Sequence, residues 1–135
     1  MSAPVVTATI GNADYETRLD DGTHTWFADE PASLGGADTA PQPAALLLSS
    51  LGACTSITLR MYAKRKDWPL ASVRVELSMQ STADGTVIDR RISLAGPLDD
   101  EQRERLLQIA NACPMHKVLA GAIRIDSGLV PAEPA

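Results

Sequence analysis

Residues 43–70 read PAALLLSSLGACTSITLRMYAKRKDWPL. Pro43 can open a helix because a missing amide donor costs little at the first helical position. Apolar side chains then fall on several faces, and charge begins at Arg60 and rises toward the end, where cations interact favourably with the helix dipole. Pro69 cannot continue the pattern. The stretch therefore predicts a long helix over 43–66 that is buried on most of its sides.

This apolar helix could in principle span a membrane. The uncharged run over 40–59 is about the length that a bilayer requires, but it contains five hydroxyl residues as well as Gly52. The N-terminal MSAPVVTATI lacks the positively charged start and apolar core of a signal peptide. We therefore expect a core helix in a cytoplasmic protein that has no membrane contact.

The composition limits the possible partners and the size of the fold. The chain has 135 residues, 44% hydrophobic and 4% aromatic, which suits one domain with an aliphatic core. A net charge of −5 disfavours binding to nucleic acid. We expect a single domain over 1–130 and a disordered tail over 131–135, without internal repeats.

Alternating and punctuated patterns flank the long helix. Strand-like alternation precedes it and a Gly- and Pro-rich loop leads into it, whereas strands and shorter helices follow it. The expected elements are strands within 4–28, a loop over 29–43, a hairpin over 72–80 and 86–95, helices over 98–113 and 115–120, and a strand over 122–129. This order predicts an α+β fold with antiparallel sheet. No Gly-rich strand-to-helix turn suggests a nucleotide site.

Cys54 lies in the middle of the long helix, two residues after Gly52. Glycine costs about 1 kcal/mol relative to alanine inside a helix, so its presence suggests that another group approaches the backbone closely here. A free cysteine is usually a small buried hydrophobe. In a reducing compartment, two cysteines that are far apart in sequence are either such core residues or thiols with a chemical role.

Cys113 precedes Pro114, which breaks a continuing helix. We expect Cys113 to end one helix and to cap the next, where free amides and the helix dipole favour a thiolate. The alternative is a junction residue that only packs. These local electrostatics favour Cys113 as the reactive thiol.

Two histidines complete the candidate residues. His116 follows Cys113 by three residues, a plausible ligand spacing, whereas His24 lies in an expected strand. With Cys54 they could form a zinc set, but no second close pair is present, so we expect no metal and no cofactor. Either histidine can equally be a surface or core residue.

The same motifs resemble a known family. LGACT and TLRMYA on the long helix, with DEPASLGG before them and QRERLLQIANACPMHKVL after them, are similar to the OsmC/Ohr superfamily (osmotically inducible protein C and organic hydroperoxide resistance). The resemblance covers about residues 29–129. The pairing of LGAC with CP-x-H is more specific than either motif alone.

The resemblance implies an intertwined homodimer with a six-stranded antiparallel sheet from each chain and a long central helix. It implies thiol-dependent reduction of organic hydroperoxides, in which Cys54 is peroxidatic and Cys113 resolves the sulfenic acid into a disulfide. A dithiol of the lipoyl type would be the reductant. The family thus assigns the nucleophile to Cys54, against the local electrostatics.

One departure from the family concerns the groups that orient the thiolate. The best-studied members carry a glutamate just inside the central helix and an early arginine, whereas this chain has Pro43-Ala44-Ala45 at the helix start. Arg18 is the sole arginine in the expected N-terminal strands and a candidate thiolate partner. The missing carboxylate leaves open a second hypothesis, a non-enzymatic dimer that binds a small molecule or senses redox state.

Overall fold

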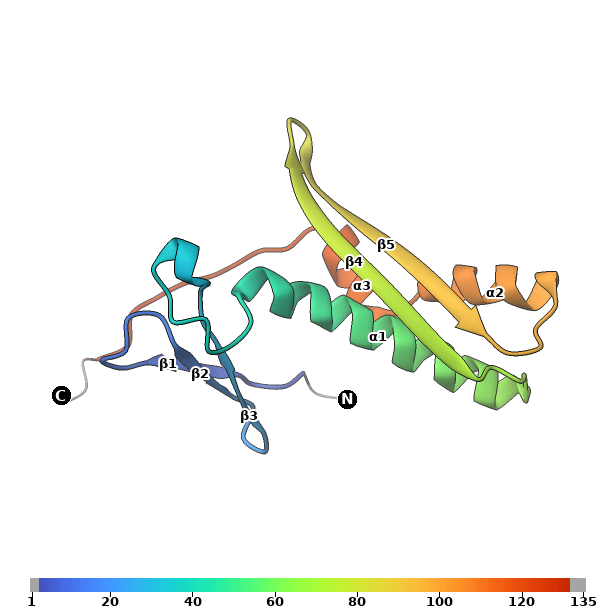
Figure 1. The fold of residues 1–135 in the computed structure, drawn as a ribbon, viewed down its shortest axis with the longest axis horizontal. Helices are drawn as coiled ribbons and strands as arrows, with labels where there is room; N and C mark the ends of the chain where they lie inside the picture. The colour runs from blue at the N-terminus through green and yellow to red at the C-terminus, as the bar shows by residue number, and fades with distance from the viewer. Residues whose placement is uncertain (1–2, 132–135) are drawn as a thin grey trace. The chain divides into compact units, whose positions relative to one another are not determined.

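A computed structural model describes residues 3–131 and confirms the α+β fold with antiparallel sheet (Figure 1). The strands are β1 (Thr7–Ile10), β2 (Thr17–Asp20), β3 (Thr25–Ala28), β4 (Ser72–Thr82) and β5 (Gly85–Ala95). The helices are a 3-10 turn η1 (Ala32–Leu34), α1 (Pro43–Lys66), α2 (Asp100–Ala110) and α3 (Pro114–Ala120). The predicted bounds of the long helix are confirmed.

The chain divides into two compact units. One comprises Met1–Ala53 with Val75–Arg91, and the other Cys54–Arg74 with Ile92–Ala135. α1 and the β4–β5 hairpin each contribute to both units. The prediction of one domain over 1–130 stays a prediction, and residues 132–135 of the predicted tail lie outside the described residues.

The first unit contains a three-stranded antiparallel sheet in the order β1-β2-β3. Its register pairs Ala8 with Leu19 and Arg18 with Phe27. In the same unit, α1 approaches β4 at Gly52, where a Cβ atom would lie 2.9 Å from the Leu77 side chain. This contact accounts for the helical glycine.

The second unit holds the main core. Leu59, Tyr62 and Ala63 of α1 pack with Leu106 and Ala110 of α2, and Leu70 and Leu98 complete the cluster. Leu59 and Leu106 are fully buried. α2 begins with a capping box: Asp99 accepts from the Gln102 amide, and the Gln102 side chain accepts from the Asp99 amide.

α1 is less buried in one chain than its composition predicts. Leu51, Thr55 and Leu59 form a buried stripe at helical spacing, whereas Ile57 and Met61 are 54% and 66% exposed. By length and hydropathy alone, α1 could cross a membrane. The prediction that α1 is buried on most sides is wrong for the single chain. Within the described residues one stripe of the helix is buried, and no other element of the chain covers its remaining apolar faces.

The predicted strand over 122–129 is wrong for the single chain. Residues 122–131 have no strand assignment, and Ile125, Leu129 and Val130 are more than 80% exposed. A strand needs a neighbour to satisfy its backbone groups, and none pairs with this segment within the described chain. The described chain accordingly has five strands in sheets of three and two, instead of the six-stranded sheet that the resemblance implies.

The loop between β3 and α1 is closed by a buried carboxylate. Asp29 is 2% exposed, and its oxygens accept from the Glu30 amide and from both the amide and hydroxyl of Thr39. Its own amide donates to the Pro41 carbonyl at 3.0 Å. The Thr39 hydroxyl, followed by the two amides, lowers the pKa of Asp29 below its ordinary value.

We expect acid to release this loop. A carboxyl whose pKa is lowered by folding stabilises the protein above its ordinary pKa of 3.8, and this contribution is lost as the pH falls through the folded pKa. Asp29→Asn should lower the urea midpoint at pH 7, and the difference from wild type should shrink as the pH approaches the folded pKa. Exposed Asp84→Asn is the control, and parallel pH profiles for wild type and Asp29→Asn would contradict the expectation.

Two glycines with similar backbone angles give a second prediction. Gly96 has φ 131° and Gly85 has φ 126°, but a Cβ at Gly96 would lie 2.2 Å from the Pro69 carbonyl oxygen, whereas nothing lies within 4 Å at Gly85. Gly85→Ala should cost about 1–3 kcal/mol from backbone strain alone. Gly96→Ala should cost clearly more, because backbone must move. Denaturant unfolding at equal protein concentration measures both, and equal losses would refute the steric argument.

Candidate functional site

α1 presents Cys54 and Thr55 at the point where the second unit begins. Thr55 is fully buried within the Leu51–Leu59 stripe, and Cys54, one position earlier, is half-buried. Consecutive helical residues point about 100° apart, so Thr55 lies in the stripe and Cys54 lies beside it. The edge of the buried stripe thus carries one partly accessible thiol and one inaccessible hydroxyl.

Cys113 is held at the junction between α2 and α3. α2 ends at Ala110, whose carbonyl accepts from the Cys113 amide, and Pro114 opens α3 at a position that needs no amide donor. Cys113 has extended backbone angles and its Sγ accepts from the His116 amide at 3.3 Å, so it caps α3 as predicted. Unlike Cys54, its side chain is fully buried.

The first turn of α3 brings the two cysteines together. The Met115 amide donates to Cys54 Sγ at 3.5 Å, and the next amide along, that of His116, donates to Cys113 Sγ at 3.3 Å. Thr55 Oγ1 lies 3.9 Å from Cys113 Sγ. Both cysteines are free thiols. Two thiols separated by 59 positions in sequence therefore contact adjacent backbone donors.

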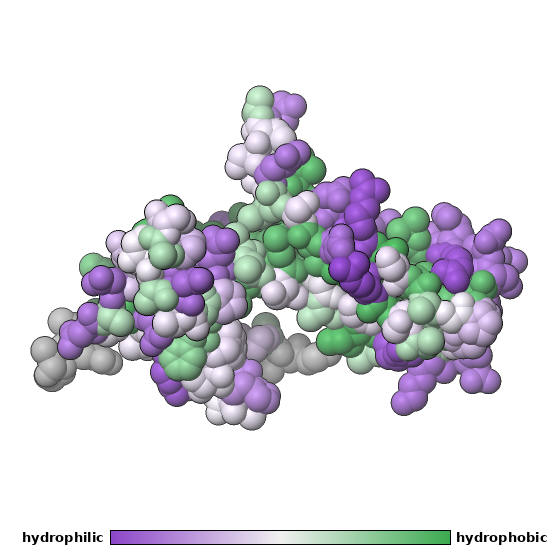
Figure 2. All heavy atoms as spheres, in the orientation of Figure 1, coloured by the Kyte–Doolittle hydropathy of each residue, from purple (hydrophilic) through white to green (hydrophobic). Residues whose placement is uncertain are grey.

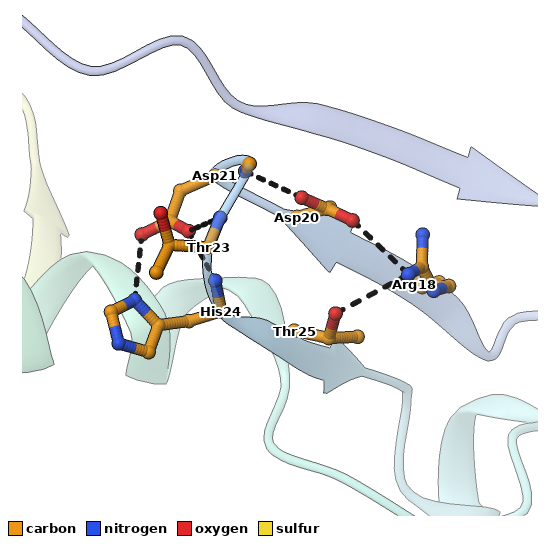
Figure 3. Close-up of polar contacts among 7 residues, drawn as sticks. Arg18, Asp20, Asp21, Thr23, His24 and Thr25 are labelled. Carbon is orange, nitrogen blue, oxygen red and sulfur yellow. Dashed lines mark hydrogen bonds and ion pairs between the residues drawn. The ribbon is translucent and has the colours of Figure 1, made fainter.

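Arg18 occupies a different setting in the β2–β3 hairpin (Figure 3). Its guanidinium contacts Asp20 at 3.1 Å and donates to Thr25 at 3.3 Å. These two partners account for its position within its own unit. Its predicted role as a thiolate partner remains untested.

His24 belongs to the same hairpin turn and pairs with Asp21, whose carboxylate caps the turn (Figure 3). Hydrogen bonds from the His24 and Thr23 amides lower the pKa of Asp21 to about 2. His24 is 76% exposed, so its role in the described chain is to support a surface turn. His116 contributes its amide to Cys113 as described above.

A metal-binding cluster does not form from the candidate residues. Within residues 3–131, no group of three or more His, Cys, Asp or Glu side chains is arranged to hold an ion. The first turn of α1, beginning at Pro43, carries no acidic residue. The polar contacts of the two thiols in the described structure are therefore with backbone amides and with Thr55, and the first turn of α1 supplies no carboxylate.

Sequence reasoning missed Thr55 and the Met115 amide. A signal for Thr55 was available, because it is a polar residue in the Leu51–Leu59 stripe and follows a candidate cysteine directly. The Met115 amide carries no sequence signal, since any residue other than proline supplies one.

Comparison with known proteins identifies the family. A family model described as OsmC-like protein matches residues 35–128, more than half of the chain. The chain belongs to the OsmC-like family. A comparison with curated protein sequences finds no match.

Solved structures share the fold of this OsmC-like chain. An OsmC-like protein from Mycoplasma pneumoniae is 19% identical with a TM-score of 0.77, covering 89% of each chain. The organic hydroperoxide resistance protein OhrB of Bacillus subtilis is 24% identical with a TM-score of 0.63, covering 89% of this chain and 92% of its own. An organic hydroperoxide resistance protein OsmC from Legionella pneumophila is 23% identical with a TM-score of 0.65, covering 90% and 91%. At these identities the likeness establishes the fold.

Proposed function

We propose that this OsmC-like protein reduces organic hydroperoxides, with Cys54 as the peroxidatic thiol and Cys113 as the resolving thiol. The observation that carries the proposal is the pair of consecutive amides, of Met115 and His116, that contact the two sulfurs. Two thiols at the start of one helix are placed so that, once one is oxidised to a sulfenic acid, the other can form a disulfide with it. The names of the hydroperoxide resistance proteins that share the fold agree with this chemistry.

The difference in burial supports the division of roles. Cys54 is partly exposed, whereas Cys113 is fully buried. A peroxide must reach the attacking sulfur, but a resolving sulfur needs access to its partner alone. Accessibility therefore favours Cys54 as the nucleophile, although Cys113 occupies the helix cap that local electrostatics would select.

The proposed reduction of the hydroperoxide has three steps. The Cys54 thiolate attacks the peroxide oxygen, so that an S–O bond forms, the O–O bond breaks, and the alkoxide takes a proton to leave as an alcohol. The Cys113 thiolate then attacks the sulfenic sulfur, forming the disulfide and releasing hydroxide, which is protonated to water. A dithiol reductant of the lipoyl type restores both thiols by disulfide exchange and becomes a disulfide itself.

The apolar surface of the chain supports a homodimer. Hydrophobic side chains are visible on the surface of the molecule (Figure 2). Ile57 and Met61 on α1 and Val87 on β5 are exposed. The extended segment 122–131 adds further exposed aliphatic side chains. Large exposed apolar patches on a soluble protein usually mark an interaction surface. We infer that a second copy covers α1 and pairs with the C-terminal segment, and that the dimer is cytoplasmic, where free thiols persist.

The absence of an acidic residue in the first turn of α1 favours a second candidate, a non-enzymatic dimer that binds a small molecule or senses redox state. Native mass spectrometry of the purified protein distinguishes it. A stoichiometric bound molecule together with no peroxide turnover would favour binding, whereas turnover without a retained ligand would favour the peroxidase.

The peroxidase proposal predicts distinct outcomes for the two thiols. With tert-butyl hydroperoxide and dihydrolipoamide, Cys54→Ser should reduce peroxide consumption to background. In a separate reaction without dihydrolipoamide, Cys113→Ser should consume one equivalent of peroxide and accumulate a sulfenic acid that dimedone traps, because the protein has no second thiol to condense with it. Ferrous–xylenol orange detection of residual peroxide and intact-mass spectrometry measure both. Full turnover in Cys54→Ser would remove that residue from the mechanism.

The dimer proposal is tested on α1. Met61→Lys places a charge on the helix face that the second copy would cover, and burying an unpaired charge costs several kcal/mol. We expect sedimentation velocity to show a shift from dimer to monomer. Leu34→Lys in η1 is the matched control, since Leu34 is 61% exposed compared with 66% for Met61. An unchanged dimer in Met61→Lys would place the interface elsewhere.

A further inference from the structure

We propose that Thr55 is a positioning residue for Cys113, in that its hydroxyl holds and stabilises the sulfur that closes the disulfide. The proposal deepens the function proposed above and rests on it. Thr55 Oγ1 lies 3.9 Å from Cys113 Sγ, and both side chains are fully buried. In a neutral pair either atom can donate, but once Cys113 is a thiolate the hydroxyl alone carries a proton to donate.

Burial makes this contact consequential. A thiolate removed from water must be stabilised by protein groups, because an unpaired buried charge is strongly disfavoured. Two polar contacts reach Cys113 Sγ in the described structure: the His116 amide at 3.3 Å and the Thr55 hydroxyl at 3.9 Å. The amide belongs to the segment of Cys113 itself, whereas Thr55 belongs to the helix that carries Cys54. The Thr55 contact therefore connects Cys113 to the helix that carries Cys54.

The chain position of Thr55 gives the contact its geometric role. Thr55 follows Cys54 directly on α1. The same stretch of helical backbone therefore fixes the positions of the Cys54 sulfur and of the hydroxyl that faces Cys113. A β-branched side chain has few χ1 rotamers in a helix, and full burial restricts it further. The hydroxyl thus fixes Cys113 Sγ from the α1 side while the His116 amide fixes it from the α3 side.

The affected step is disulfide closure. The Cys113 thiolate attacks the Cys54 sulfenic acid, the S–S bond forms, the S–O bond breaks, and hydroxide leaves to become water. Removing the hydroxyl but keeping the shape, as in Thr55→Val, withdraws the donor from the attacking sulfur. Oxidation of Cys54 is the internal reference, because Cys54 Sγ accepts from the Met115 amide and the Thr55 hydroxyl faces Cys113 instead.

The experiment mixes reduced full-length protein with one equivalent of tert-butyl hydroperoxide, quenches with dimedone at intervals, and quantifies sulfenic adduct and disulfide by mass spectrometry. We expect Thr55→Val to slow disulfide closure about tenfold and to accumulate the adduct, as loss of a hydrogen bond to a charged group predicts. Thr55→Ser keeps the hydroxyl and should close near the wild-type rate. Thr58→Val makes the same chemical change one turn along α1 and should also resemble wild type.

Closure at the wild-type rate in Thr55→Val would overturn the proposal. Equal slowing in Thr55→Ser would also overturn it, because shape rather than the hydroxyl would then matter. If Thr55→Val does not fold, the Thr55→Ser and Thr55→Ala pair gives the same comparison, with fast closure expected for serine and slow closure for alanine.

The role of Thr55 can be separated from the peroxidase activity. Diamide drives closure of a vicinal dithiol without any peroxide, by forming an adduct on one thiol that the other displaces. If wild-type protein ignores the hydroperoxide but the variants keep their predicted order with diamide, the peroxidase proposal fails and the positioning role of Thr55 stands. If wild type consumes hydroperoxide and all variants close alike, the reverse holds.

Discussion

Adjacent amides at the first turn of α3 are the constraint on which the site depends. Met115 and His116 donate to sulfurs that come from opposite parts of the chain, Cys54 on α1 and Cys113 at the cap. Pro114 makes this possible, because it ends the preceding helical path and starts a new one without needing an amide partner. The hydrophobic core of the second unit then fixes α1 against α2, and with it the height of Cys54 relative to the turn.

Polar groups support this arrangement where the chain changes direction. Arg60, on the far side of α1 from Cys54, donates to the Leu70 carbonyl and to the Ala71 carbonyl, which ties the helix to the connection that follows it. Arg103 of α2 donates to the Leu94 and Gly96 carbonyls in the same manner. These guanidinium contacts add side-chain donors to carbonyls at the points where the chain leaves a strand or helix.

Much of the fold could be predicted from periodicity and punctuation. The bounds of α1 followed from Pro43 and the terminal cations, and the helix-capping role of Cys113 followed from Pro114. The strand over 122–129 was predicted from its β-branched pattern, which reports propensity but cannot report whether a partner edge exists. The prediction that α1 is buried on most sides failed for a similar reason. A sequence shows that a helix face is apolar but does not show what covers it.

The candidate site was harder to predict than the fold. Sequence alone singled out both cysteines, yet their meeting at one turn depends on tertiary packing between segments 59 positions apart. Thr55 escaped notice because threonine is common in helices and its burial is visible only after α1 is packed. Charge and chain position alone indicate Arg18, which pairs with Asp20 inside its own unit, and its role as a thiolate partner stays a prediction.

The burial of Cys113 also imposes a direction on thiol exchange. When the two sulfurs are joined, an incoming reductant meets the Cys54 sulfur, because the other is enclosed. Cys113 is then the leaving group, and its departure is eased by the cap that receives it. If the proposed disulfide forms, a bulky thiol would form its mixed disulfide with Cys54 on α1, and the enclosed Cys113 sulfur would be shielded from further oxidation.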